Sequence, residues 1–418
     1  MRLYIETFKM NTNYALTQDQ QDAYAQIVHL LITPGQKELV VLGGAGTGKT
    51  TLVNTFLEEW PQFVAISGGT YKDIDVHLTA TTNKAADALS AATNKETTTI
   101  HSLLGLRVVS TGFRESILKD TGKPVPDGLI IIDEASFIDA LLLHKIRQKA
   151  KGNKVIFLGD PCQLKPVGSD NTPVFDSGIT TVKLSQIVRQ ADNSPIQILS
   201  KALRDHVAGA PMPKAGVDGI SIFHMQKEEF EASLIEDCRT HAGNAVRALA
   251  WTNQTAIGYN QMVSHALSGN SEIKLGDTVV VNKQIQKRGV YKLPTDSTVT
   301  VTAVGQWKKD AYDIYSRAVE LNGHICIRQA KNITDTYDVI KQAYNEDNPS
   351  KAHDIENGYA DLRLMYASTV NKAQGSTYDT VYINLTDIGK CRDQDQVKRM
   401  LYVAVSRART KVVFTGDL

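Results

Sequence analysis

Short strand-like runs alternate with helix-like segments through the N-terminal half of the chain. The runs lie at residues 38–42, 76–80, 129–132 and 154–158, and an Ala-rich helix is predicted at 83–92. Continuous apolar runs of this length between helices are typical of parallel strands that are buried on both faces. Because such sheets collect their chemistry at the carboxyl ends of strands, we expect active-site residues directly after these runs.

The C-terminal half repeats this pattern with an interruption. Strand-like runs at 248–251, 362–366, 381–385 and 411–414 predict a second α/β lobe. Alternating β-branched residues at 275–281 and 297–304 predict short antiparallel strands between them. The polar segment 337–359 fits either a helical extension or a mobile arm, and the sequence leaves both open.

A Gly-rich turn joins the first apolar run to the helix-like segment that follows it. Gly43 to Thr50 read GGAGTGKT, in the strand–turn–helix context that a phosphate-binding P-loop requires. The glycines allow backbone N–H groups to surround a triphosphate, and the helix N-terminus adds its positive dipole end. Lys49 is expected to reach the β- and γ-phosphates, and the Thr50 hydroxyl to hold Mg²⁺. The predicted ATP-binding residues of this segment are Gly43, Gly46, Gly48, Lys49, Thr50 and Thr51.

Polar residues follow two of the buried runs. Asp133 and Glu134 come directly after one, and we assign Asp133 to the Mg²⁺ shell and Glu134 to orienting or deprotonating the attacking water. An acidic helix N-cap is the alternative, but it explains one carboxylate and not the repeated placement. Gln163 follows the next run and is expected to contact the γ-phosphate and report its loss.

The second lobe has no P-loop in its sequence, and such a lobe usually donates residues to the site of the first. Arg189 and Arg407 stand in segments suited to this. An arginine supplied across a cleft stabilises charge on the transferring phosphoryl group, which is worth ~10³ to 10⁵ in rate.

Composition narrows the class of protein. A chain of 418 residues is long enough for two or three domains, and a net charge of +1 means that a nucleic-acid partner needs a local channel. The four cysteines are far apart, which disfavours a zinc or iron–sulfur site and favours a reducing compartment. No apolar run has transmembrane length and residues 1–13 lack the apolar core of a signal peptide, so we expect a cytoplasmic protein without membrane contact.

Five motifs in one order carry a resemblance to a known family. They are GGAGTGKT, IIDEAS, GDPCQLKPV, STVNKAQGS and YVAVSRAR, and together they resemble superfamily 1 helicases of the RecD-like branch, most of all the Dda type of T-even phages. The resemblance implies an α/β fold of two RecA-like lobes. The first lobe (1–98 and 129–182) would hold a small β-hairpin wedge insert at 99–128, and the second (183–272 and 361–418) an SH3-like β insert at 273–360.

The same resemblance implies roles for individual residues. Gln20 would read the adenine, Gln374 and Gly375 would join the nucleotide site, Arg189 would be the arginine finger and Arg407 the second γ-phosphate arginine. The implied DNA-binding residues are Thr79, Thr82, Asn83, Lys84, His101, Phe113, Thr252, Asn253, Thr369 and Lys372.

Five positions qualify this assignment. Thr81 and Asn371 stand where the family often has proline and histidine, which puts their own DNA contacts in doubt. Phe113 either tips the wedge, where base–aromatic stacking is worth about 1–3 kcal/mol per base, or packs the hairpin against its lobe, and both readings stay open. Lys398 and Arg399, before YVAVSRAR, are interpreted as solvated surface.

The resemblance implies an ATP-dependent DNA helicase that moves 5′ to 3′ on single-stranded DNA and unwinds duplex. Two alternatives remain: an RNA helicase or nucleoprotein-remodelling translocase, and an ATPase subunit of a larger replication or recombination complex. The expected cofactors are ATP and Mg²⁺. The expected partners are single-stranded and fork DNA, with replication or recombination proteins as further candidates. A monomer is expected, in the host cytoplasm if a phage encodes the chain.

Overall fold

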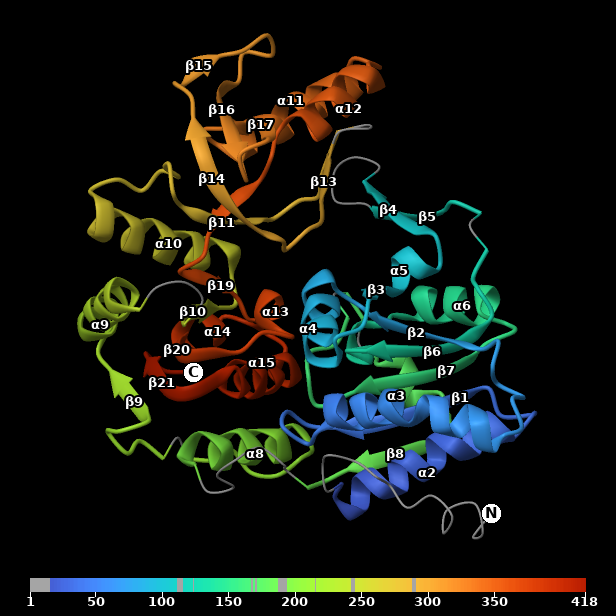
Figure 1. Cartoon of the computed structure of the whole chain (residues 1–418). Helices are drawn as coiled ribbons and strands as arrows, with labels where there is room; N and C mark the ends of the chain where they lie inside the picture. Colours follow the sequence, from blue (N-terminus) through green and yellow to red (C-terminus); the bar gives the residue numbers. More distant parts are fainter. Residues whose placement is uncertain are drawn as a thin grey trace.

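Two parallel sheets, each covered by helices, organise the chain in the computed structural model (Figure 1). The structure describes residues 16–110, 116–122, 124–166, 168–169, 171–186, 194–214, 216–241, 245–287 and 291–418. Within these ranges, no helix is both long enough and apolar enough to cross a membrane.

The first lobe is built on a sheet in the order β3-β2-β6-β7-β1-β8, with every neighbouring pair parallel. Its strands are β1 (Glu38–Gly43), β2 (Asp75–Ala80), β3 (Thr97–Thr99), β6 (Gly128–Asp133), β7 (Lys154–Gly159) and β8 (Thr181–Leu184). Its helices are α2 (Gln18–Ile32), α3 (Lys49–Ile66), α4 (Asn83–Thr93), α5 (Ile100–Leu103), α6 (Ala140–Lys149) and α7 (Pro173–Asp176), with a short 3₁₀ turn η1 (Ala135–Phe137).

The continuous apolar runs of this lobe arise because both faces of its sheet are buried. Along β6, Leu129 and Ile131 join the core under α2 and α3, whereas Ile130 and Ile132 join a second core under α5 and α6. Alternate residues of one strand therefore serve two cores, which requires an unbroken apolar run.

The second lobe has the sheet order β19-β10-β20-β21-β9, again with parallel neighbours. Its strands are β9 (Ile222–Met225), β10 (Val246–Ala250), β19 (Ala367–Thr369), β20 (Tyr378–Asn384) and β21 (Ala408–Thr415). Its helices are α8 (Pro195–Val207), α9 (Lys227–Thr240), α10 (Asn253–Ser268), α13 (Val370–Ala373), α14 (Leu385–Ile388) and α15 (Gln394–Ser406).

Two smaller β structures are inserted into these lobes. In the first lobe, β4 (Leu106–Ser110) and β5 (Ser116–Asp120) form an antiparallel hairpin. The connection 111–115, including Phe113, lies outside the described residues. Both readings of Phe113 therefore stay open.

In the second lobe, an antiparallel sheet runs in the order β15-β16-β14-β11-β18, with β17 beside β16, and β12 and β13 form a separate hairpin. The strands are β11 (Thr278–Val281), β12 (Ile285–Lys287), β13 (Tyr291–Leu293), β14 (Thr298–Val304), β15 (Lys308–Lys309), β16 (Tyr315–Leu321), β17 (Ile325–Ala330) and β18 (Leu362–Leu364). The polar segment 337–359, for which the sequence left two alternatives, is helical, with α11 (Ile333–Asn345) packed on α12 (Pro349–Gly358).

The element boundaries differ from the predicted ones in three places. The run 362–366, predicted for the second-lobe sheet, supplies β18 to the insert, where Leu362 and Leu364 pack into the insert core. Strand β8 crosses the predicted lobe boundary after residue 182, and β3 includes Thr99 from the predicted wedge. Strand β9 was not predicted, because it lies at the sheet edge and is apolar on one face.

Candidate functional site

The Gly-rich turn between β1 and α3 has the backbone of an anion-binding loop. Gly46 and Gly48 adopt left-handed φ angles of 80° and 79°, and a Cβ at Gly43 would lie 2.4 Å from the Thr47 hydroxyl oxygen. Gly48 caps α3 without any side-chain hydrogen bond, so the first N–H groups of this 18-residue helix have no side-chain acceptor. Uncapped N–H groups at a helix N-terminus favour a bound anion.

Lys49 and Gln20 lie directly against this loop. The Lys49 ammonium donates to the Gly43 carbonyl at 2.7 Å and the Gly44 carbonyl at 3.1 Å. The Gln20 side chain, buried at the start of α2, donates to the carbonyls of Thr47 at 3.3 Å and Gly48 at 3.4 Å. The Lys49 ammonium and the Gln20 side-chain amide thus both hold the loop by hydrogen bonds to its carbonyls. Thr50 and Thr51 follow on the first turn of α3.

Asp133 ends β6 and Glu134 follows it directly, and the two acidic residues are half-buried. Burial raises the pKa of the Asp133 carboxyl, although the Lys49 ammonium and the Glu134 N–H, at 2.8 Å, oppose the rise. Burial, followed by the Asp133 charge, raises the pKa of Glu134 to about 7. Glu134 also has a left-handed φ of 53°, and its Oε2 is buried without a hydrogen-bond partner among the described residues. A carboxylate oxygen buried without a partner lowers the stability of the fold, and such groups are concentrated at functional sites.

The oxygen ligands at this position suit a hard divalent cation. The Thr50 hydroxyl and the Asp133 carboxylate are the side-chain types that Mg²⁺ accepts beside nucleotide phosphates. Within the described ranges, no group of three or more His, Cys, Asp or Glu residues makes an all-protein metal site. The residues present therefore fit a cation that depends on the nucleotide for further ligands.

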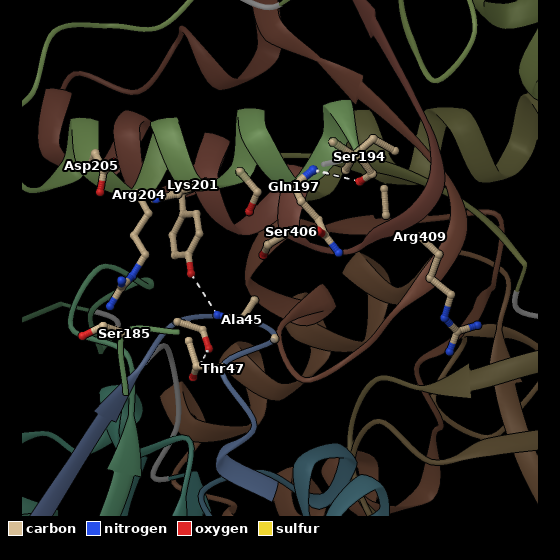
Figure 2. A pocket seen from close by; sticks show the side chains of 16 residues that line it. Ala45, Thr47, Ser185, Ser194, Gln197, Lys201, Arg204, Asp205, Ser406 and Arg409 are labelled. Carbon is tan, nitrogen blue, oxygen red and sulfur yellow. Dashed lines mark hydrogen bonds between the residues drawn. The ribbon is translucent and has the colours of Figure 1, made fainter. Parts of the chain in front are cut away.

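A cavity of about 580 Å³ lies between the two lobes at this loop (Figure 2). Residues 44–47 line it from the first lobe, and side chains of α8 and α15 line it from the second. The second-lobe liners include Gln197, Lys201, Arg204, Tyr402 and Ser406. The nucleotide loop therefore faces the second lobe across a space large enough for a small ligand.

A buried polar cluster joins the lobes beside this cavity. The Ala45 N–H donates to the Tyr402 hydroxyl at 3.2 Å, and that hydroxyl donates to Asp160 Oδ2 at 2.6 Å. Asp160 is fully buried and also accepts from Arg204 Nε at 3.3 Å and the Cys162 N–H at 3.1 Å. Burial and the Asp160 charge raise the pKa of Tyr402 well above its usual value, so the phenol stays protonated.

The cluster of Asp160, Tyr402 and Arg204 was not predicted from the sequence. Asp160 directly follows β7 and Asp133 is the last residue of β6, so the position of Asp160 after a buried apolar run was the signal that could have found it. Tyr402 begins the motif YVAVSRAR, which was a signal for the site but not for this contact, and Arg204 lies inside α8 and outside the quoted motifs.

Gln163 and Gln374 form a second contact between the lobes. The Gln374 amide donates to Gln163 Oε1 at 3.0 Å, and both side chains are buried. Gly375 has a left-handed φ of 73°, and its ideal Cβ would contact Ala85 of α4 at 3.6 Å. Two predicted nucleotide-site residues of the second lobe therefore lie against the first.

The interpretation of Arg399 as solvated surface was wrong. Its guanidinium donates to the carbonyls of Pro161 at 2.5 Å and Gln163 at 2.7 Å and pairs with Asp395 at 2.8 Å. The side chain is only 11% exposed, because α15 packs against the loop that follows β7.

Of the two predicted catalytic arginines, only Arg407 lies within the described residues, and Arg189 lies outside them. Arg407 is buried at the end of α15, where its guanidinium donates to Val403 O at 3.2 Å, Ser376 O at 3.2 Å and Ser406 Oγ at 2.8 Å. Its charge opposes the rise that burial causes in the pKa of Glu134, so it acts across the lobe boundary.

The predicted DNA-binding residues of the first lobe are mostly engaged within the protein. Thr79 is fully buried between β3 and β6 and donates to Ile131 O at 2.9 Å, which contradicts a DNA contact in this conformation. Thr82 caps α4 by accepting from Ala85 N. Asn83 donates to Thr295 O at 3.1 Å, and His101 is half-buried, with burial lowering its pKa against the opposing Asp139 charge.

The second-lobe candidates meet Lys84 at a small groove. Lys84, Asn253, Thr369 and Lys372 line a cavity of about 40 Å³ together with insert residues. The Lys84 ammonium donates to Lys372 O at 3.4 Å, and Lys372 pairs with Asp296 at 3.2 Å. The other liners are Arg247, Ala256, Ile257, Asn260, Val280, Asn282, Asp296, Arg363, Leu364, Ala367 and Ser368.

Hydrogen bonds fix the remaining second-lobe candidates at helix starts. Thr369 caps α13, and Thr252 caps α10 while its hydroxyl donates to Asp387 at 2.9 Å. The side-chain amide oxygen of Asn253, Oδ1, accepts from the Arg363 guanidinium at 3.0 Å. Lys84 and Lys372 therefore bring positive charge from both lobes to one groove.

Comparisons with known proteins agree with this arrangement. A family model described as an AAA domain matches residues 15–216, and one described as a UvrD-like helicase C-terminal domain matches residues 364–415. The ATP-dependent RecD2 DNA helicase of Deinococcus radiodurans is 26% identical over 92% of this chain, which spans about half (47%) of that relative. The ATP-dependent DNA helicase dda of Enterobacteria phage T4 is 23% identical over 96% of this chain and 99% of its own.

A solved structure shares the fold. It concerns DNA unwinding at forked dsDNA by two coordinating Pif1 helicases, and it matches 97% of this chain and 93% of its own with a TM-score of 0.55 and 18% identity. The predicted α/β class with two RecA-like lobes is confirmed, while the wedge and SH3-like character of the inserts stay predictions. Residues 15–216 thus match an AAA domain and residues 364–415 a UvrD-like helicase C-terminal domain, and over most of its length the chain is similar to the ATP-dependent DNA helicases RecD2 and Dda.

Proposed function

We propose that the chain is an ATP-dependent DNA helicase that moves 5′ to 3′ on single-stranded DNA and unwinds duplex at a fork. The observation that carries the proposal is the junction at the nucleotide loop, where Ala45 is hydrogen-bonded to Tyr402 of the second lobe. A ligand at this loop changes the contacts that hold the lobes together, which is what a two-lobe motor needs. The relatives RecD2 and Dda are named as ATP-dependent DNA helicases.

Hydrolysis is assigned to the residues around the loop. Lys49 binds the phosphates, and Glu134, whose pKa burial raises to about 7, takes the proton of the attacking water. Thr50 and Asp133 hold Mg²⁺, which when bound neutralises charge on the β- and γ-phosphates. Gln163 contacts the γ-phosphate and reports its loss. Arg189 and Arg407 stabilise the negative charge of the transition state.

The remaining residues of the proposal bind nucleotide and strand. Gln20 reads the base, while Gly43, Gly46, Gly48, Thr51, Gln374 and Gly375 shape the pocket. Lys84 and Lys372 are the proposed phosphate contacts of the DNA strand, since one lysine comes from each lobe and both line the groove between them. Asn83, Asn253, Thr252 and Thr369 border the same strand path, and Thr82 and His101 extend it along the first lobe.

Steady-state ATP hydrolysis by the purified chain tests this proposal. Wild type is expected to hydrolyse ATP faster with oligo(dT) than with oligo(U) or with no oligonucleotide. Lys49→Ala is expected to lose about 10² to 10³-fold in turnover, because it removes the cation at the transferring phosphate. Its circular dichroism should match wild type, because Lys49 bonds only to loop carbonyls.

Three outcomes would contradict the proposal. Equal stimulation by RNA favours an RNA-directed motor. Hydrolysis that no nucleic acid stimulates favours an accessory ATPase subunit. Full activity of a folded Lys49→Ala variant removes the site assignment.

A further inference from the structure

Arg204 extends from α8 of the second lobe onto the nucleotide loop of the first. A Cβ placed on Gly44 would lie 3.0 Å from Arg204 Nε, 3.2 Å from its Cδ and 3.3 Å from its Cζ. The guanidinium therefore packs directly against the backbone of the loop, and Figure 2 shows it pointing from α8 toward that loop. No sequence motif singles out this arginine.

The donors of Arg204 are only partly used. Nε donates to Asp160 Oδ1 at 3.3 Å, and its two terminal nitrogens make no hydrogen bond to the residues that the structure describes. The side chain is 30% exposed and lines the 580 Å³ cavity. A guanidinium has five N–H donors in a planar fork, and four of them remain for a ligand here.

Asp160 fixes the direction of this fork. Its carboxylate is fully buried and is held by the Tyr402 hydroxyl at 2.6 Å and the Cys162 N–H at 3.1 Å as well as by Arg204. Because Asp160 takes Nε, the terminal nitrogens remain for a ligand in the cavity that this side chain lines. The Asp160 charge also raises the pKa of Arg204 against the effect of burial, so the guanidinium stays charged.

The other charged groups at the cavity do not substitute for Arg204. Lys201 and Asp205, its neighbours on α8, are exposed, and Arg409 pairs with Asp379 at 3.2 Å. Arg407 does not line the cavity, since its guanidinium is bonded within the second lobe. Arg204 is the cation of α8 that touches the loop.

We propose that Arg204 binds a phosphate group of the nucleotide through its terminal nitrogens, and that Asp160 positions it for this. The inference rests on the proposed function, because it deepens the same ATP site with a residue beyond Arg189 and Arg407. A planar fork that meets a phosphate forms charge-assisted, often paired, hydrogen bonds. The same contact draws α8, and with it the second lobe, onto the bound nucleotide.

Binding of a fluorescent non-hydrolysable ATP analogue tests the role of Arg204. Arg204→Gln is expected to weaken the Kd by about 10- to 100-fold, the range for losing hydrogen bonds between charged groups. Arg204→Lys keeps the charge without the fork and is expected to recover part of the affinity. Arg239→Gln is the matched control, because Arg239 is an exposed second-lobe arginine that pairs with Glu236 on α9. Its Kd should equal that of wild type.

The outcomes separate this inference from the proposed function. If wild-type protein neither binds the analogue nor hydrolyses ATP, the proposed function fails. If wild type does both and folded Arg204→Gln binds within twofold of it, only the role of Arg204 is overturned. Melting temperatures identify unfolded variants, and where the Gln variant is unfolded, the Kd of Arg204→Lys decides: weaker binding supports the contact and unchanged binding overturns it.

Discussion

One buried carboxylate, Asp387, fixes the loop that starts α10. Its side chain is 1% exposed and accepts from the N–H groups of Trp251 at 2.8 Å and Thr252 at 2.9 Å, and from the Thr255 hydroxyl at 2.7 Å. Burial alone would raise the pKa of Asp387, but these hydrogen bonds, led by the Thr252 N–H, hold it below 3.8. A single residue thus sets the positions of the proposed DNA residues Thr252 and Asn253.

Replacing Asp387 by asparagine gives a pH-dependent loss of stability. Because the folded pKa lies below the unfolded one, the charged form stabilises the fold above pH 3.8 and this contribution is lost as pH falls through the folded pKa. Asp387→Asn should lower the free energy of unfolding by ~1.5–3 kcal/mol at pH 7. Denaturant midpoints should show a constant difference from about pH 8 to 5 and a smaller one below about 4.

Asp379→Asn serves as the control, since Asp379 is half-exposed and pairs with the exposed Arg409. It should change stability by less than about 1 kcal/mol. A deficit of Asp387→Asn that stays the same down to the lowest pH at which wild type is folded would contradict the linkage.

At the scale of elements, the loop between β13 and β14 covers the proposed DNA groove. The Thr295 carbonyl accepts from Asn83 of α4, and Asp296 pairs with Lys372 at 3.2 Å. Asp296 has a left-handed φ of 66°, which asparagine also tolerates. A DNA phosphate that binds Lys372 competes with this carboxylate for the charge of one ammonium, which also donates to Asn282 Oδ1.

Asp296→Asn should therefore raise the affinity for single-stranded DNA. The gain is expected to be about two- to fivefold at low salt, the range for a partly exposed ion pair, and to shrink as salt screens the pair. Fluorescence anisotropy across a salt series measures it. Lys372→Ala is the matched counterpart and should weaken binding. It should also make the slope of log binding constant against log salt concentration shallower by about 0.7. Weaker binding by Asp296→Asn would show that Asp296 does not compete with DNA.

The elements that could be predicted from the sequence are those whose residue pattern follows from their own immediate surroundings. Central strands such as β6 and β7 need apolar residues on both faces, and the P-loop needs its glycines, so the pattern was sufficient. β18 was assigned to the wrong sheet because its alternating burial fits either an insert or an edge strand. Contacts such as that of Arg399 with the loop after β7 depend on how two lobes pack, which no local pattern encodes.

At the scale of the whole molecule, contacts between the lobes gather at the nucleotide loop after β1 and at the loop after β7. Tyr402, Gln374 and Arg399 of the second lobe all reach the loops that end β1 and β7. The same lobe carries Lys372 through α13, which follows β19. A change at the nucleotide loop can therefore move the proposed DNA contacts as one body, which is the physical basis of stepping in this account.

Strand displacement on tailed duplexes tests the central claim most directly. With ATP, the purified chain should release the labelled strand from a duplex with a 5′ single-stranded tail and leave a duplex with a 3′ tail intact. Lys49→Ala should release neither. Release from the 3′-tailed duplex alone would contradict the direction of movement. ATP hydrolysis stimulated by DNA without release from either substrate would contradict the assignment of the chain as a helicase.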